Sequence, residues 1–189
     1  MRNHSIAIMQ AFRQTGARLR GDRRGVSAVE FALILPVMIS LYLGLTEVSQ
    51  GIGIKRKVTL TAHALSDLAS NPAAGRTITE AEVASVLTAA TAVIAPYPAA
   101  PLTVTVTAVN IDKNGKATVG WSRGGAQHSP GGGVTIPSAL AVPNSQLIMS
   151  EVSYAYTPAI GHAITGTLTL SDKLYMAPRR GDAITLQAS

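Results

Sequence analysis

The sequence predicts an α+β protein, in which a long N-terminal transmembrane helix leads into an exported domain with a second helix and an antiparallel sheet. Three observations support this prediction. An uncharged apolar run at residues 31–46 passes into a stretch with apolar residues at helical spacing. A capping pattern near residue 79 begins a second helix. From residue 102 the apolar residues recur with period two, which is typical of strands. A chain of 189 residues has room for one modest domain and an anchor.

The positive charge is concentrated at the N-terminus. The net charge is +6, and residues 1–25 contribute +5 of it, with six arginines against Asp22. Residues 26–189 carry ten basic and nine acidic side chains, so the remainder of the chain is nearly neutral. A basic tail before an apolar run stays in the cytoplasm, whereas a nucleic-acid-binding domain needs a basic face in its folded part. We predict a basic cytoplasmic leader, 1–25, and no nucleic-acid partner.

The transmembrane helix is predicted to comprise residues 26–54. Helical residues 31–46 alone would span about 24 Å, which is less than the ~30 Å hydrocarbon core of a bilayer. The flanking residues make the span long enough if Glu30 and Glu47 lie near opposite interfaces, or if one of them is neutralised by a partner. The basic triplet 55–57 ends the span and is outnumbered by the six arginines of the leader, which favours a cytoplasmic N-terminus.

Pro36 lies inside this helix and removes one backbone hydrogen bond, so it should kink or loosen the helix locally. Two interpretations remain open: a tolerated kink, or a helix that bends when the protein leaves the bilayer. A secretory signal peptide is the competing interpretation of the whole N-terminal region. It fits less well, because no Ala-x-Ala follows, Ser49-Gln50-Gly51 is a weak substitute, and Glu30 precedes the apolar run.

Two helices are expected before the sheet. The first continues to about residue 70, because apolar residues recur at steps of three and four until Asn71-Pro72. Thr79 and Glu82 form a capping-box pattern that begins the second helix, and Pro96 ends it. The apolar positions of the first stretch are Val58, Ala62, Leu65 and Leu68/Ala69, and those of the second are Val83, Val86, Leu87, Ala90, Val93 and Ile94.

The sheet is expected to begin with a hairpin. Residues 102–108 alternate apolar and hydroxyl side chains, as in a half-buried strand, and Val109 and Ile111 suggest a bulge or register change. Asn114-Gly115 is a strong hairpin turn, with 117–122 as the return strand. The glycine-rich residues 123–133 are expected to form a flexible loop. Two further strands are predicted, at 147–156 and 167–176, which completes an exported α+β domain at 55–189.

The chemistry of an enzyme is not apparent in the sequence. The chain has no cysteine, which removes disulfides, zinc–thiolate sites and thiol catalysis. The four histidines are widely separated, and the glycine cluster lacks the Gly-Lys-Ser/Thr ending of a phosphate loop. The acidic residues Asp67, Glu151 and Asp172 could converge as an acid–base pair, but their spacing does not favour this. We expect no enzyme activity, no metal site and no cofactor, with a secreted hydrolase as a minor alternative.

Gly25, followed after four residues by Glu30-Phe31 at the edge of the apolar run, resembles the processing signature of type IV prepilin-like proteins. The chain is most similar to the TadE-like minor pseudopilins of the Tad (tight adherence)/Flp pilus. The resemblance is most specific over residues 25–54. It extends to 152–158 and 170–180, where a strand runs into a Pro-Arg pair, and residues 71–145 match nothing.

This resemblance implies a function. A prepilin peptidase would cleave between Gly25 and Val26, while Glu30 and Phe31 would serve assembly with other pilins or pseudopilins and pilus assembly proteins. The Glu30 carboxylate would pair with the N-terminal amine created by cleavage, in the same or a neighbouring subunit. The protein would be a single-pass inner-membrane protein with a pilin-like domain in the periplasm. The alternative is a single-pass protein with an uncleaved signal anchor and a periplasmic binding domain.

Overall fold

The computed structural model of the chain describes residues 24–73 and 75–187, so the predicted basic leader lies almost entirely outside the described residues. The chain divides into two units between Thr46 and Glu47. Residues 25–46 are called the anchor segment below, and residues 47–187 are called the sheet domain. The first helix, α2 (Arg24–Ala69), is continuous through Pro36 and contributes to both units.

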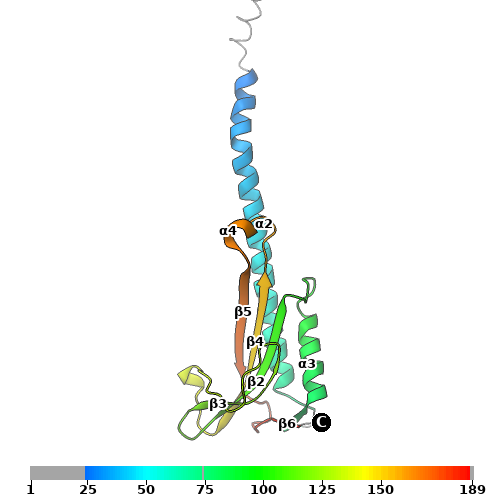
Figure 1. Cartoon of the computed structure of the whole chain (residues 1–189), viewed down its shortest axis with the longest axis vertical. Helices are drawn as coiled ribbons and strands as arrows, with labels where there is room; N and C mark the ends of the chain where they lie inside the picture. The colour runs from blue at the N-terminus through cyan, green and yellow to red at the C-terminus, as the bar shows by residue number, and fades with distance from the viewer. Residues whose placement is uncertain (1–23, 74, 188–189) are drawn as a thin grey trace, which may run out of the picture. The chain divides into compact units, whose positions relative to one another are not determined.

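The remaining elements all belong to the sheet domain (Figure 1). They are β1 (Thr77–Thr79), α3 (Glu80–Ala92), β2 (Leu102–Ile111), β3 (Ala117–Gly124), the 3-10 helix η1 (Ser138–Leu140), β4 (Ser145–Tyr156), α4 (His162–Thr165), β5 (Leu168–Met176) and β6 (Thr185–Gln187). The long helix, the second helix and the four-stranded antiparallel sheet confirm the predicted α+β class.

The part of α2 in the sheet domain buries the predicted apolar stripe. Buried apolar residues recur at every third or fourth position, and each is at most 3% exposed: Ile54, Val58, Ala62, Leu65 and Ala69. Leu68, offered with Ala69 as the last position of the stripe, is 42% exposed and lies outside it. The helix ends at Ala69, just before Asn71-Pro72, as predicted.

The second helix begins with the predicted capping box. The Glu82 backbone N–H donates to the Thr79 hydroxyl at 3.2 Å, and the Glu82 carboxylate accepts the Thr79 backbone N–H at 2.9 Å. Two donors at the helix start are thereby satisfied. Val83, Ala90 and Ile94 are buried in one hydrophobic cluster with the α2 stripe and with side chains of β2, β3 and β4. The two helices therefore share one core with the sheet.

The sheet has the strand order β3-β2-β4-β5, and every neighbouring pair is antiparallel. The predicted Asn-Gly hairpin joins β2 to β3. The Asp112 carboxylate accepts the backbone N–H groups of Asn114 and Lys116 at 2.8 and 2.9 Å, and Gly115 has a φ of 80°, which glycine adopts without strain. The two later strands are also confirmed, as β4 and β5.

The prediction that the first strand is half-buried is wrong. Two of the threonines on the second face of β2 are buried, with Thr105 at 1% and Thr107 at 0% exposure, and Thr103 is half-buried. Thr107 and Ser122 share a hydrogen bond of 2.8 Å between their hydroxyls, and Thr105 accepts the Ala126 backbone N–H at 3.0 Å. The hydroxyls are buried because polar partners reach them from β3 and from the segment that follows it.

The predicted register change exists, but its cause differs from the expectation. The pairing of β2 with β3 shifts between Ala108 and Val109, where Gly120 of β3 is the extra residue. The pairing of β2 with β4 continues without interruption, so β2 keeps its alternation. Val109 and Ile111 are apolar because that end of the second face has its own small core, covered by Val134, Ile136 and Leu140.

The glycine-rich segment 123–133 folds back on the sheet and is not a free loop. Gly124 still belongs to β3, and the Gly125 backbone N–H donates to the Val104 carbonyl at 3.0 Å. Further along, Val119 exchanges backbone hydrogen bonds with Gly132 and Gly131, both at 2.8 Å. The segment thus covers part of the outer edge of β3, which is one way in which proteins protect an edge strand.

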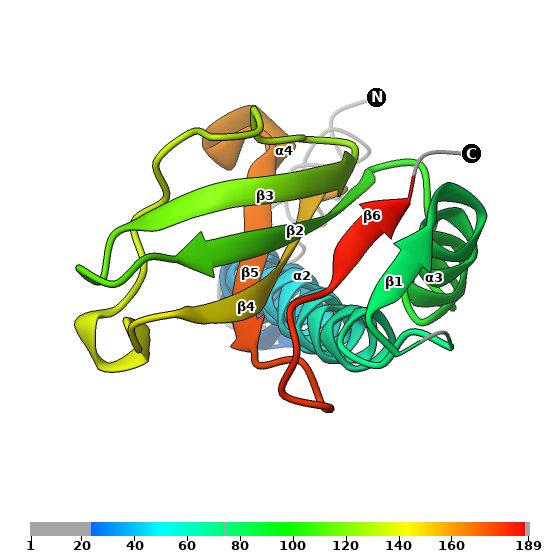
Figure 2. The same ribbon diagram turned by 90° about the horizontal axis from the view of Figure 1, so that it is seen from below.

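A parallel pair of short strands closes the domain and was not anticipated. β1 pairs with β6 through Thr77–Thr185, Ile78–Leu186 and Thr79–Gln187, and the pair lies beside α3 (Figure 2). The segment leading to β6 is held at Ile184, which is 1% exposed. The Trp121 indole N–H donates to the Ile184 carbonyl at 2.9 Å, and the Gln146 side chain accepts the Ile184 N–H at 2.7 Å.

Candidate membrane anchor and processing site

The anchor segment presents its apolar side chains outward. Its large apolar residues are between 39% and 70% exposed, except for Leu43, which is half-buried. Those exposed are Val26, Val29, Phe31, Leu33, Ile34, Leu35, Val37, Met38, Ile39, Leu41, Tyr42 and Leu45. Within the described residues, α2 is the one helix long and apolar enough to cross a membrane. A helix that is apolar on all sides needs an apolar surrounding.

The length of this exposed run fits a bilayer. Residues 25–46 would extend about 33 Å as a helix, close to the ~30 Å of a hydrocarbon core. Two hydroxyls in the segment bond to the backbone of the helix itself: Ser40 donates to the Pro36 carbonyl and Thr46 to the Leu43 carbonyl, both at 2.8 Å. Internal satisfaction of polar groups is what a lipid surrounding requires.

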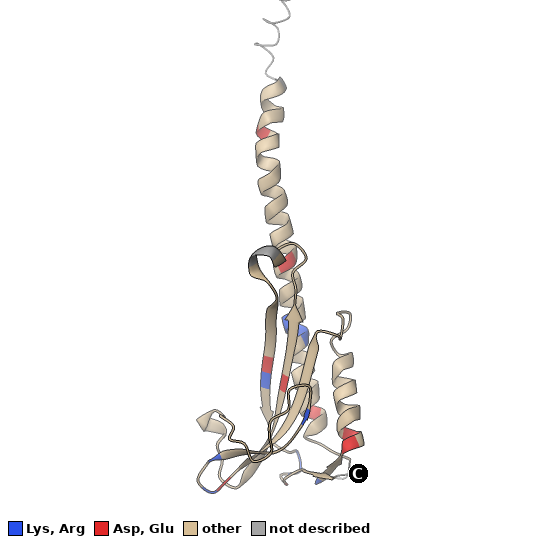
Figure 3. Ribbon diagram, in the orientation of Figure 1, with Lys and Arg blue, Asp and Glu red and all other residues tan. Residues whose placement is uncertain are grey.

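Glu30 is the one charged side chain between residues 25 and 46, and charges are sparse along this part of α2 (Figure 3). It is exposed on the helix surface, one turn from Val26. Residues four apart lie on the same face of a helix, so a free amine at Val26 would be a neighbour of the Glu30 carboxylate. The structure places Gly25, Val26 and Phe31 on the same exposed helix, with Phe31 64% exposed. No heavy atom lies within 4 Å of a Cβ built on Gly25.

Glu47, the first residue of the sheet domain, has a structural role that the sequence did not reveal. Its carboxylate accepts the backbone N–H of Gly161 at 3.0 and 2.9 Å and also that of Ile160. A Cβ at Gly161 would lie 2.8 Å from the Glu47 carboxylate, so a larger residue there would make that carboxylate shift. The Tyr156 hydroxyl donates to the Glu47 carbonyl at 3.4 Å. An acidic residue between two apolar stretches was the available signal, but its partner is 113 residues away in the sequence.

The three acidic residues considered for acid–base chemistry do not converge. Asp67 pairs with Arg179, Glu151 with Lys173 and His128, and Asp172 with Lys55 and the Thr59 hydroxyl. Each carboxylate is therefore neutralised by a cation of its own, which is the arrangement of structural ion pairs. A general acid–base pair would instead bring two such groups together.

The cluster around Glu151 is the densest of these ion pairs. The Glu151 carboxylate lies 2.6 Å from the Lys173 ammonium and 2.5 Å from the His128 imidazole. Burial raises the pKa of Glu151, but the hydrogen bonds from Lys173 and His128 outweigh it, so the pKa lies below its ordinary value. The same contact raises the pKa of Lys173. Because β4 and β5 bear Glu151 and Lys173 at paired positions, this cross-strand pair links the two strands.

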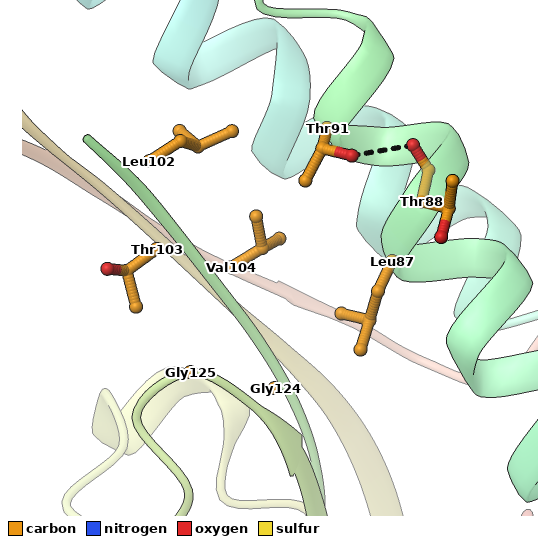
Figure 4. Close-up of a pocket in the computed structure, with 8 residues that line it drawn as sticks. All are labelled: Leu87, Thr88, Thr91, Leu102, Thr103, Val104, Gly124 and Gly125. Carbon is orange, nitrogen blue, oxygen red and sulfur yellow. Dashed lines mark hydrogen bonds between the residues drawn. The ribbon is translucent and has the colours of Figure 1, made fainter. Parts of the chain in front are cut away.

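A shallow groove between α3 and the start of β2 offers little chemistry (Figure 4). Its lining is made of uncharged side chains and glycine backbone: Leu87, Thr88, Thr91, Leu102, Thr103, Val104, Gly124 and Gly125. The Thr91 hydroxyl is already bonded to the Thr88 carbonyl at 2.7 Å. No group of three or more His, Asp or Glu side chains suited to a metal ion occurs among the described residues.

Comparisons with known proteins give one match. No curated protein and no solved structure matches the chain. The family model described as TadE-like protein matches residues 25–65, which include the anchor segment and most of the α2 stripe. The resemblance predicted from Gly25 and Glu30-Phe31 is therefore confirmed, because residues 25–65 match the TadE-like family model.

Proposed function

We propose that this chain is a minor pseudopilin of a Tad/Flp-type adhesive pilus. A prepilin peptidase removes residues 1–25, the anchor segment holds the mature protein in the inner membrane, and the sheet domain lies in the periplasm. The protein then takes part in pilus assembly as a structural component and not as an enzyme. The family match indicates a Tad pilus-associated protein, and the exposed apolar helix indicates a membrane-anchored one. Processing, orientation and the role in assembly are what the proposal adds.

The main support for the proposal is that the family match, the exposed apolar run and a single charged residue occur in the same stretch of α2. The TadE-like match begins at Gly25, which is also where the exposed apolar part of α2 begins, and the one charge of that part is Glu30. A carboxylate at the centre of a membrane costs about 2.5–3.5 kcal/mol, so a chain that retains one near the membrane edge has a use for it. Pairing with the amine of Val26 would supply that use.

The packing of α2 disfavours cleavage by signal peptidase near Gly51. Such a cut would remove Glu47, whose carboxylate holds the backbone of Ile160 and Gly161. It would also leave Ile54, which is only 3% exposed, three residues from a new chain end. A cut after Gly25 leaves all these contacts in place.

Reading the N-terminus of the membrane form in the native cell tests processing. We expect the mature chain to begin at Val26, and Gly25→Val to leave a full-length precursor. Gly44→Val is the matched control, because Gly44 lies on the same helix with no heavy atom within 4 Å of a built Cβ. It should be processed normally. A mature chain beginning at Met1 would support the uncleaved signal anchor, and one beginning near Gly51 would support signal peptidase.

Orientation is tested separately. A periplasmic phosphatase fused after Ser189 should be active, because the basic leader keeps the N-terminus in the cytoplasm. A reporter that works only in the cytoplasm should be silent at the same position. Activity of the second reporter would reverse the topology.

The role of Glu30 is tested with Glu30→Gln. The variant should insert and should largely be cleaved, since a neutral side chain is easier to place in a membrane. Recovery of the major pilin or of a partner pseudopilin with it should fall, together with surface piliation, because the partner of the amine is lost. Unchanged recovery and piliation would mean that Glu30 only reaches to the membrane surface.

A further inference from the structure

We infer that the α4 loop, residues 157–167, is a second membrane-contacting element that rests in the interface of the bilayer. The inference rests on the proposed membrane anchoring, and it takes the span as residues 26–46, which is shorter than the predicted span of 26–54 and ends where the first unit ends. Its partner is the lipid surface, and Glu47 is the residue that positions it. The following observations carry it.

The loop is fixed at the end of the sheet domain where the chain leaves the anchor segment. Glu47 directly follows Thr46, the last residue of the first unit. Its carboxylate holds the backbone N–H groups of Ile160 and Gly161, and β5 begins directly after the loop with Leu168 paired to Tyr156. If residues 26–46 fill the hydrocarbon core, Glu47 lies at its edge, and the loop bound to Glu47 lies near the same level.

The composition of the loop suits that level. No Asp, Glu, Lys or Arg occurs between residues 152 and 171. Ile160 in the loop is 56% exposed, and Leu168, the first residue of β5 after it, is 41% exposed, so neither apolar side chain is used by the core. The hairpin turn after β2, by comparison, carries Asp112, Lys113 and Lys116 within five residues. A loop that has His162 as its one titratable side chain and that exposes an aliphatic side chain is suited to lipid headgroups and the adjoining acyl chains.

Glu47 explains how an acidic residue is tolerated there. A carboxylate that accepts two backbone N–H groups is well solvated by the protein itself. The same bonds satisfy donors of a loop that would otherwise need water. Glu47 thus acts as a positioning residue, because it sets the height of the loop and does not itself touch lipid.

Nitroxide labels in the full-length chain test the inference. The chain has no cysteine, so Ile160→Cys, Val142→Cys and Met38→Cys each give one labelled site. The protein is reconstituted in vesicles of phosphatidylethanolamine and phosphatidylglycerol, and collisions of each label with oxygen and with a water-soluble nickel chelate are measured. Val142 is the matched control: it is 59% exposed, in the loop after η1 and away from Glu47. Met38 reports on the span itself.

We expect a several-fold higher oxygen-to-nickel collision ratio at Ile160 than at Val142, and the highest ratio at Met38. A label at Ile160 that matches Val142 would overturn the inference, and so would one shielded from both reagents, which would indicate a second copy of the chain. A low ratio at Met38 would instead overturn the proposed span. The two failures are therefore distinguishable.

The positioning role has its own test. Glu47→Ala should make the Ile160 label more mobile and lower its oxygen preference, while the Met38 label stays unchanged. Glu47→Gln keeps one acceptor oxygen and should give a smaller change. An Ile160 label that is indifferent to Glu47→Ala would reject Glu47 as the positioning residue.

Discussion

The two parts of α2 are one continuous helix in two different surroundings. Before residue 47 nearly all the large apolar side chains are exposed, and one charge interrupts them. After residue 47 the helix buries a stripe from Ile54 to Ala69, and two of its polar side chains bond to β5: Lys55 to the Ser171 carbonyl at 2.6 Å, and Thr59 to the Asp172 carboxylate. The helix itself is unbroken from Arg24 to Ala69.

The difference shows that the boundary of the domain is set by what the side chains contact and not by the helix. The helix is unbroken at residue 47, so its secondary structure does not show where the domain begins. Most helical stability in proteins comes from the packing of one face. The anchor segment has no packed face within the described residues, so its helix depends on a surrounding that supplies one. The same kind of substitution should therefore lower the free energy of unfolding at a buried position after residue 47 and leave it unchanged before residue 47.

Leucine-to-alanine substitutions should show the largest contrast. Leu65 is fully buried, so Leu65→Ala should lower the free energy of unfolding of the sheet domain by about 2–5 kcal/mol. Leu45→Ala, at a site 69% exposed, should leave it unchanged. Denaturant titration of the detergent-solubilised chain, followed by the fluorescence of Trp121, measures both. Equal losses would mean that the anchor segment packs on the domain.

Glycine-to-alanine substitutions should give a smaller contrast. A methyl group on Gly53 would collide with the Tyr97 hydroxyl, whereas one on Gly44 would meet no heavy atom within 4 Å. Gly53→Ala should therefore cost about 1–3 kcal/mol through overpacking, and Gly44→Ala should leave the unfolding midpoint unchanged. The same titration serves, and a neutral Gly53→Ala would show that Tyr97 moves aside freely.

Acid should weaken the contact of α2 with β5 only slightly. The Thr59 hydroxyl, and then Lys55, hold the pKa of Asp172 below its ordinary value of 3.8. A carboxyl with a lowered folded pKa contributes stability above its ordinary pKa and loses it as the pH falls through the folded value. Below about pH 4 the wild type should therefore lose up to about 1 kcal/mol more than Asp172→Asn, since exposed pairs are weak. Parallel pH slopes for the two proteins would show that the pair contributes nothing.

The sequence predicted those elements whose determinants are local. The capping box of Thr79 and Glu82, the Asn114-Gly115 turn and the apolar stripe around Leu65 each lie within a few residues, and each was confirmed. The resemblance of the anchor segment to TadE-like proteins was likewise predicted from Gly25 and Glu30. Processing at Gly25 and pairing of Glu30 remain predictions, because they depend on other molecules.

What the sequence did not predict depends on distant partners. Thr105 and Thr107 read as a solvent-facing row, but polar groups from residues 122 and 126 cover them. Glu47 meets Ile160 across 113 residues, and β1 meets β6 across a similar separation. Short strands such as β1 and β6 have no periodicity of their own, so only the completed fold defines them.

The hydrogen bonds to the Ile184 backbone determine when the sheet domain can finish folding. β6 is the last strand of the chain, and the side chains that secure the residue before it, Trp121 and Gln146, come from the middle of the sheet. A chain that emerges N-terminus first cannot close this core until residue 184 has arrived. If the domain is exported as proposed above, it is therefore still unfolded at this point while residues before 184 pass through the translocation channel.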